Sequence, residues 1–306
     1  MSVSTLKKLG FVCGLLVVLW IAYLYRQVPH ETAPFAKAAD SASHVLRQQG
    51  SKKVHLSKEA GSWKVQLDSR VWSPADDDQI KRLLSALKEA QVEDVISDRA
   101  DRASEFEVDE TRGIRMTVED AKGTMLAEGI FGKLAPDAMH IYMRYPGQPI
   151  VRLARGVFPE ELGKPDPNAW RSRNLVEIPE NKIQAILIQG QGFKTELVQV
   201  STNAWTMNGK SVGTRLIDSL VGALAHLQAV DFIDSANYPG LAYDSLTYAR
   251  LSVKAKDAAA ELRVGPLDGQ TKRYPVSTGQ DAGLAWVSET TINSLLQKPS
   301  AFREKH

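Results

Sequence analysis

The sequence predicts an α+β fold of two tandem repeated domains, each a mostly antiparallel sheet with a covering helix, behind one N-terminal transmembrane helix. Three observations predict it: an uncharged apolar run near the N-terminus, an amphipathic helix pattern that occurs twice, and short alternating segments after each occurrence. We expect a transmembrane anchor at residues 1–26, a linker at 27–52, a first α+β repeat at 53–176 and a second at 177–306.

Composition restricts the class of protein. The chain has 306 residues, 43% of them hydrophobic and 24% charged, which is ordinary for a globular protein and long enough for two domains. The net charge of +2 is too small to favour nucleic acid as a partner. The single cysteine, Cys13, excludes an internal disulfide framework and a site built from several thiolates.

Residues 9–25 have the length and the flanks of a membrane anchor. A helix of 17 residues is roughly 26 Å long, and lysines that snorkel before it make up the rest of the ~30 Å hydrocarbon core. Basic residues before the run favour a cytoplasmic N-terminus, and aromatic rings at its far end favour the headgroup layer. The residues that carry this prediction are Lys7, Lys8, Leu9, Trp20, Tyr23 and Tyr25.

Two other interpretations of the run stay open. A cleaved signal peptide needs small residues at positions −3 and −1, and residues 21–27 read IAYLYRQ. A lipid-modified cysteine needs a small residue before it, and Val12 precedes Cys13. We therefore expect an uncleaved anchor, with the bulk of the chain outside the cytoplasm.

The best internal match is a helix face. Four apolar residues stand at i, i+3, i+4 and i+7 in the first half, and four stand 137 residues later at the same spacing. They are Ile80, Leu83, Leu84 and Leu87, followed by Ile217, Leu220, Val221 and Leu224. The repeated face predicts one covering helix in each half.

Shorter matches flank these helices in the same order. Strands are expected at 62–65, 114–118, 130–132 and 151–153 and again at 204–207, 249–253, 263–265 and 285–287. Each half is expected to close with a short helix, at 158–162 and at 292–296. The linker is expected to contain a short helix around 36–48.

These features resemble a bacterial family known as domain of unknown function 4340 (DUF4340). The resemblance rests on the tryptophan strand at Trp63, the helix at 77–90, the segment 106–109, the strand at Ile114 and the closing Trp170-Arg171-Ser172-Arg173. The family pattern has tyrosine-glycine-leucine where this chain has Phe106-Glu107-Val108, and the second half has an inserted proline in Tyr238-Pro239-Gly240-Leu241. The resemblance implies a periplasmic, membrane-anchored protein, with some members accompanying ABC-type export systems, and it brings no catalytic or ligand residues.

Candidate sites for chemistry have simpler explanations. The run Asp76-Asp77-Asp78 stands at a helix N-terminus, where carboxylates cap orphan N–H groups. His226 is expected to be a satisfied or surface residue, and His140 is expected on an exposed sheet face. The segment 190–195 has the wrong spacing for a phosphate loop and predicts a hairpin turn. We expect no catalytic residue, metal or cofactor.

Aromatic residues provide the remaining candidates. Trp63, Trp170 and Trp205 are expected in the core. The leading hypothesis is a non-catalytic accessory protein that binds another envelope or transporter protein. One alternative is an envelope glycan- or lipid-binding module, which would gather Trp72, Tyr142, Tyr243 or Trp286 in a cleft. The other is a hydrolase of unrecognised type, which would need carboxylates or histidines with perturbed pKa values.

Overall fold

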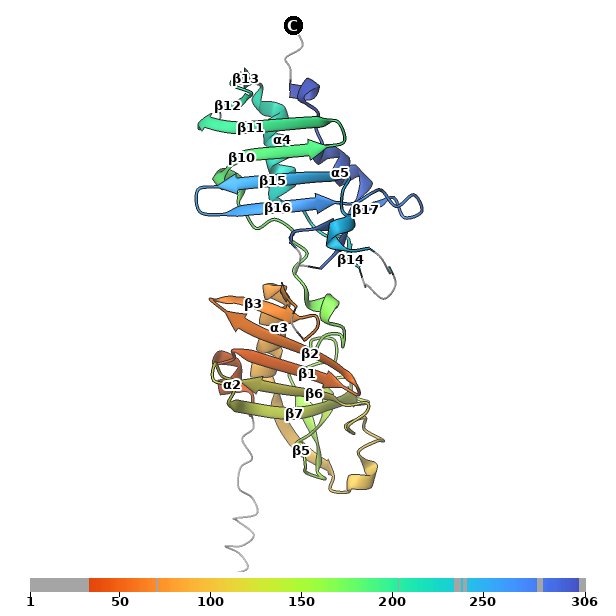
Figure 1. Cartoon of the computed structure of the whole chain (residues 1–306). Coiled ribbons are helices and arrows are strands. Elements are labelled where there is room, and N and C mark those ends of the chain that lie inside the picture. The colour runs from red at the N-terminus through yellow and green to blue at the C-terminus, as the bar shows by residue number, and fades with distance from the viewer. Residues whose placement is uncertain are drawn as a thin grey trace, which may run out of the picture. The chain divides into compact units, whose positions relative to one another are not determined.

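The computed structural model describes residues 33–69, 71–202, 204–233, 238, 241–279 and 283–302, and it contains two nine-stranded antiparallel sheets (Figure 1). The strand order of the first sheet is β4-β3-β2-β1-β6-β7-β8-β9-β5, and that of the second is β13-β12-β11-β10-β15-β16-β17-β18-β14. The two orders coincide when β1 is matched with β10, β2 with β11 and so on to β9 with β18. The predicted α+β class is confirmed.

The first sheet is formed by nine strands, and few helices accompany it. Its strands are β1 His44–Gln49, β2 Lys52–Glu59, β3 Ser62–Gln66, β4 Trp72–Pro74, β5 Gln91–Ser97, β6 Ile114–Glu119, β7 Met125–Leu134, β8 His140–Arg144 and β9 Val151–Arg155. The helices in this part of the chain are α2 Ala36–Asp40 and α3 Asp77–Glu89, with short 3₁₀ turns η1 Ala100–Arg102 and η2 Pro167–Trp170.

The second sheet follows the same plan. Its strands are β10 Ile183–Gly190, β11 Phe193–Ser201, β12 Ala204–Met207, β13 Lys210–Val212, β14 Asp231–Phe232, β15 Ala249–Ala255, β16 Ala259–Val264, β17 Arg273–Ser277 and β18 Ala285–Ser288. Its helices are α4 Thr214–Ala225 and α5 Glu289–Leu295, with 3₁₀ turns η3 Glu180–Lys182, η4 Tyr243–Ser245 and η5 Pro299–Phe302. The predicted closing helix at 292–296 thus exists as α5.

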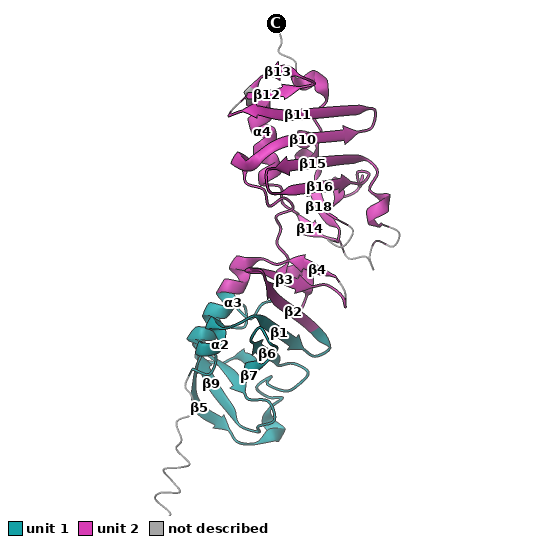
Figure 2. Ribbon diagram, turned by 60° about the vertical axis from the view of Figure 1, so that its left-hand side comes forward, with its two compact units in different colours: residues 1–52, 82–163 teal, residues 53–81, 164–306 magenta. Residues whose placement is uncertain are grey.

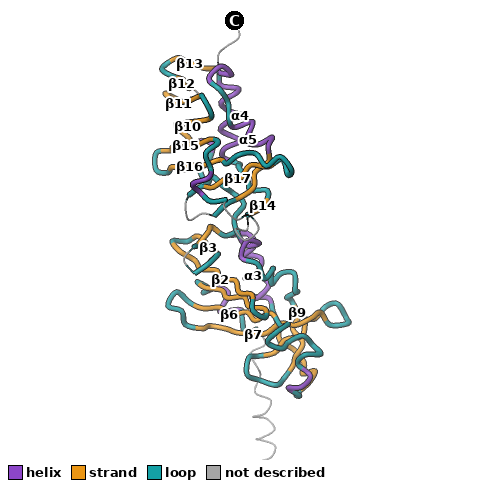
Figure 3. The backbone as a smooth tube through the Cα atoms, turned by 45° about the vertical axis from the view of Figure 1, so that its right-hand side comes forward, coloured by secondary structure: helices purple, strands orange, loops and turns teal. Residues whose placement is uncertain are grey.

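The chain divides into two compact units (Figure 2). Unit 1 comprises residues 1–52 and 82–163, and its described elements are α2, β1, β5 to β9 and most of α3. Unit 2 comprises residues 53–81 and 164–306, and it holds β3, β4 and every element of the second sheet. Helices lie along one side of the strands in each sheet (Figure 3).

The predicted helix faces are buried. Ile217, Leu220, Val221 and Leu224 of α4 belong to the main core of unit 2, together with Ile186, Ile188, Leu197, Leu251 and Val253 of the central strands. Ile80, Leu83 and Leu87 of α3 are fully buried as well, while Leu84 is partly exposed. Burying one large apolar side chain contributes about 1.5–3 kcal/mol to the free energy of folding. These helix faces are therefore the main local source of stability.

The segment predicted as a linker contains secondary structure. Residues 36–40 form α2, but residues 44–49 form β1, which lies in the middle of the first sheet and pairs with β6. The predicted helix over 36–48 is therefore wrong beyond Asp40. The strand was missed because Arg47 occupies a buried position, which hides the alternation of apolar residues.

The helix predicted at 158–162 is also absent, because this segment forms turns. The N–H of Glu161 donates to the carbonyl of Phe158 at 3.1 Å, and that of Gly163 donates to Glu160 at 3.2 Å. The six residues between Gly156 and Gly163 are too few to offset the cost of helix nucleation.

The predicted membrane anchor lies outside the described residues. Among the residues that the structure does describe, no helix is both long enough and apolar enough to cross a bilayer.

Candidate functional site

Strand β5 is the longest strand at an edge of either sheet. It has seven residues, whereas β14 at the equivalent edge of the second sheet has two. β5 pairs with β9 through an irregular register, with shifts between Val92 and Val95 and between Val95 and Ser97. The side chains of Val95 and Ile96 are 50% and 40% exposed. An edge strand with exposed apolar side chains is a surface that can accept a partner strand.

A histidine clamp holds β5 to the turn between β7 and β8. The Nε2 atom of His140 lies 3.1 Å from Oε2 of Glu93 on β5, and its Nδ1 atom lies 2.5 Å from Oδ2 of Asp137 in the turn. Arg155 at the end of β9 approaches the other oxygen of Glu93 at 3.2 Å. His140 was predicted on an exposed sheet face, but its side chain is only 15% exposed.

The clamp favours a charged imidazolium. Both ring nitrogens face carboxylate oxygens, and only the protonated ring can donate to both of them. The hydrogen bond with Asp137 is the main cause that raises the pKa of His140, and the bond with Glu93 adds to it. The pKa of Asp137 is lowered, chiefly by the backbone N–H of Met139. The arrangement therefore acts as an electrostatic clamp on the edge strand.

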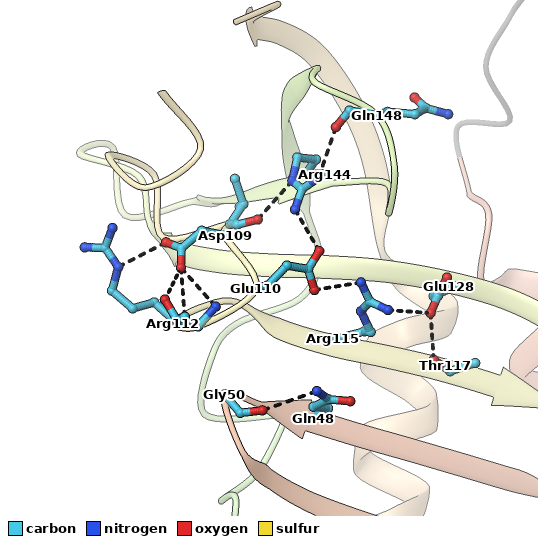
Figure 4. A network of polar contacts seen from close by, with 12 residues as sticks. Gln48, Gly50, Asp109, Glu110, Arg112, Arg115, Thr117, Glu128, Arg144 and Gln148 are labelled. Carbon is cyan, nitrogen blue, oxygen red and sulfur yellow. Dashed lines mark hydrogen bonds and ion pairs between the residues drawn. The ribbon is translucent and has the colours of Figure 1, made fainter. Parts of the chain in front are cut away.

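A charged network orders the loop before β6 (Figure 4). Glu110 bridges two strands, because its carboxylate lies 2.7 Å from Nη2 of Arg115 on β6 and 3.2 Å from Nη2 of Arg144 on β8. Arg144 also donates from Nε to the carbonyl of Val108 at 2.9 Å. Burial alone would raise the pKa of Asp109. Hydrogen bonds from the hydroxyl and the backbone N–H of Thr111, and from the backbone N–H of Arg112, outweigh that effect and lower the pKa to about 2.

The ordered loop covers a small apolar core of unit 1. This core comprises Phe106, Val108, Ile130, Ala135, Tyr142 and Val151, and the ring centroids of Phe106 and Tyr142 lie 4.7 Å apart. Glu107 has a φ of +58°, the left-handed conformation that favours glycine. A Cβ added at Gly132 would lie 2.2 Å from the carbonyl oxygen of Phe106, which shows how closely the loop packs on β7.

Arg47 is a buried cation in the middle of unit 1. Its side chain is 2% exposed, and its Nε donates to the carbonyls of Leu162 and Gly163 at 3.0 Å each. Its Nη2 donates to Oε1 of Gln49 at 3.0 Å. Burial lowers its pKa to about 10. Arg47 thus links β1 to residues 162–163, the last residues of unit 1, through hydrogen bonds to their carbonyl groups.

The closing motif Trp170-Arg171 packs within unit 2. Trp170 is fully buried, and its carbonyl accepts the N–H of Asp76 at 2.8 Å. Arg171 donates from Nε to Oγ of Ser73 at 3.1 Å and stacks 3.7 Å from the ring centroid of Phe232. Burial lowers the pKa of Arg171 to about 10. Both residues of the motif therefore have packing roles that are visible in the structure.

Several predicted roles are confirmed. Oδ1 of Asp76 accepts the N–H groups of Asp78 and Gln79 at 3.0 Å, so Asp76 caps α3. Residues 190–193 join β10 and β11 as a hairpin. His226 ends α4 with an exposed side chain, 3.1 Å from Glu180. The three tryptophans predicted in the core are buried; they are Trp63, Trp170 and Trp205.

The aromatic residues considered for a ligand platform have different surroundings. Tyr142 belongs to the small core of unit 1, and Trp286 is buried in unit 2. Trp72 and Tyr243 are partly exposed in unit 2, and the guanidinium of Arg263 lies 4.2 Å from the ring centroid of Tyr243. Among the described residues, no group of three histidines, cysteines or acidic residues could hold a metal ion.

Sequence reasoning missed the clamp and the buried arginine. Glu93 and His140 are 47 residues apart, and no local pattern connects them. Arg47 could have been found by aligning the two central strands, since Arg47 pairs with Met116 in β6 as Ile188 pairs with Leu251 in β15.

A family model matches the sequence of this chain. The model described as a domain of unknown function (DUF4340) matches residues 63–242, which is more than half of the chain. The chain belongs to this family. The DUF4340 match begins in β3 and ends just before η4, so it covers parts of both sheets. No curated protein and no solved structure matches the chain.

Proposed function

We propose that this DUF4340 protein is a membrane-anchored accessory protein of the bacterial cell envelope that docks a second envelope protein, such as a component of an ABC-type exporter, and catalyses no reaction itself. Its N-terminal helix would hold it in the inner membrane, with the globular body in the periplasm. The apolar run at 9–25 and the lysines before it support the anchor and its orientation.

The observation that carries the docking role is the edge strand β5. It presents Val95 and Ile96 to solvent beside an open backbone edge, and the clamp of His140 on Glu93 holds the start of the strand in place. A strand that is ordered before binding loses less conformational entropy when a partner strand adds to it.

We also infer that the two sheets are copies of one duplicated unit. Their identical strand orders support this, as does the equivalent register of β1 on β6 and of β10 on β15. Shared order in nine strands would be hard to obtain from unrelated sequences, because many other connections would satisfy the same hydrophobic pattern.

Site-specific crosslinking in native membranes tests the docking role. A photo-crosslinking amino acid at Val95 is expected to give a discrete adduct with one envelope protein. The matched control is Val200, which is 62% exposed on β11, a strand with neighbours on both sides. Equal labelling at the two positions, or no adduct at Val95, would contradict docking at β5.

A further inference from the structure

We infer that the tip of the β6–β7 hairpin, residues 121–126, contacts the lipid headgroup layer of the membrane that holds the N-terminus. This inference rests on the anchor in the proposed function and adds the surface of unit 1 that faces the bilayer. Three observations carry it: the exposure of the tip, an extra residue in its ladder, and the point where the chain enters unit 1.

The tip presents apolar side chains in an ordered turn. Residues 121–126 read Ala-Lys-Gly-Thr-Met-Leu, and all six are exposed, with Met125 at 58% and Leu126 at 40%. Oδ1 of Asp120 accepts the N–H groups of Lys122 at 2.8 Å and of Thr124 at 2.9 Å, which orders the turn. Lys122 is the one charged residue of the six, and its sign suits anionic headgroups.

A β-bulge places the apolar pair at the tip. Glu119 pairs with Met125, but Val118 pairs with Ala127, so Leu126 is an extra residue in the ladder. The equivalent hairpin of the second sheet has no such shift, since Lys254 pairs with Ala259 and Val253 pairs with Ala260. β-Bulges redirect side chains and are frequent at functional positions. The β15–β16 hairpin thus provides an internal control, because it has Ala259 and Ala260 where the β6–β7 hairpin has large apolar residues.

The chain enters unit 1 beside this hairpin. Phe35 is fully buried, its ring centroid lies 5.7 Å from that of Phe131, and a Cβ added at Gly129 would lie 3.2 Å from its Cζ. Met125 precedes Gly129 by four residues of β7, or about 13 Å. The apolar run of the predicted anchor ends at Tyr25, and the nine residues between Tyr25 and Phe35 span at most about 34 Å. The tip therefore lies within reach of the interface where the anchor would end.

Spin-label accessibility tests the lipid contact in the full chain. Cys13 is the single cysteine, so a Cys13→Ser background allows one nitroxide at Met125→Cys or, as the control, at Ala259→Cys. Each chain is reconstituted in vesicles of phosphatidylethanolamine and phosphatidylglycerol. We expect the label at 125 to be more accessible to oxygen and less accessible to a water-soluble nickel complex than the label at 259. A Lys122→Glu substitution is expected to reduce this difference.

The outcomes separate the lipid contact from the anchor. If carbonate extraction leaves the chain in the vesicles but both labels are equally accessible to nickel, the hairpin contact is wrong and the anchor stands. If carbonate removes the chain, the anchor and the hairpin contact fail together. Dipolar broadening between labels at 125 would show that a second copy covers the tip, and it would overturn the lipid contact.

Discussion

The two sheets have one strand order but different residues at their centres. In the first sheet Arg47 occupies the buried position opposite Met116, and in the second Ile188 occupies the buried position opposite Leu251. An isolated buried cation is costly, but the Nε–H of Arg47 is shared by two backbone carbonyls that offset part of this cost. The same strand order therefore accommodates a hydrocarbon side chain in one sheet and a cation at the corresponding position of the other.

The two sheets also differ at their boundaries. α3 begins with the cap Asp76, whereas α4 begins at Gly213 with no side-chain cap. The edge strand β5 is long and held by His140, whereas β14 has two residues. These differences lie at a helix terminus and at a sheet edge, where a substitution costs less than in a packed core.

The largest effect is expected from Gly132→Ala. The new Cβ would lie 2.2 Å from the backbone oxygen of Phe106, so the covering loop must move, at a cost of about 3 kcal/mol or more. At the matched Gly265 the Cβ would meet the side chains of Leu246 and Pro275 at 2.8 and 2.7 Å, so Gly265→Ala should cost less. Hydrogen exchange followed by mass spectrometry measures both, and equal losses of protection in the two hairpins would contradict the prediction.

Substitutions of Arg47 test whether the cation or only its volume is needed. Arg47→Ala leaves a cavity and deprives Leu162 and Gly163 of a donor, which should cost about 2–3 kcal/mol. Arg47→Ile copies Ile188 of the second sheet. It removes the same donor and the same desolvated charge as Arg47→Ala but fills most of the cavity, so it should cost less, about 1 kcal/mol. Urea denaturation compares the free energies of unfolding. A loss with Arg47→Ile as large as with Arg47→Ala would show that the cation itself holds unit 1 together.

Exchange of the helix caps should make the two helices more alike. Asp76→Ala removes the acceptor for two N–H groups and should destabilise the chain by about 1 kcal/mol. Gly213 has extended backbone, and nothing lies within 4 Å of an added Cβ. Gly213→Asp should therefore stabilise by a few tenths of a kcal/mol. Thermal denaturation measures both changes, and destabilisation by Gly213→Asp would contradict the capping argument.

The smallest effect is expected from the pH dependence of the clamp. The carboxylates raise the pKa of His140 above its ordinary 6.5, so its stabilisation is complete below pH 6.5 and disappears as pH rises through the raised pKa. Hydrogen exchange of β5 should therefore become faster over this range, after correction for the intrinsic rate. His140→Gln should abolish the change, while His226→Gln, at an exposed position, should leave it. A wild type whose β5 protection is constant with pH would contradict the clamp.

Local patterns predicted a large part of this fold. The i, i+3, i+4, i+7 spacing located α3 and α4, alternation located β6 and β15, and turn composition located the hairpin at 190–193. These elements were predictable because each is determined by neighbours in sequence and by the burial of one face. β1 was not predictable in this way, since Arg47 interrupts its apolar alternation. The edge position of β5 was equally hidden, because no residue of β5 by itself shows that the strand lies at the end of a sheet.

The sequence by itself determined the α+β class, the two covering helices, the cap at Asp76 and the prediction of an anchor at residues 9–25. The tertiary structure alone decided that β1 is central, that Arg47 binds carbonyls 115 and 116 residues away, and that His140 holds an edge strand. The two kinds of feature differ in the sequence separation of the residues that determine them. Helix and strand periodicity are properties of adjacent residues, whereas a buried cation or a clamp needs partners that only the packing of distant segments brings within hydrogen-bond distance.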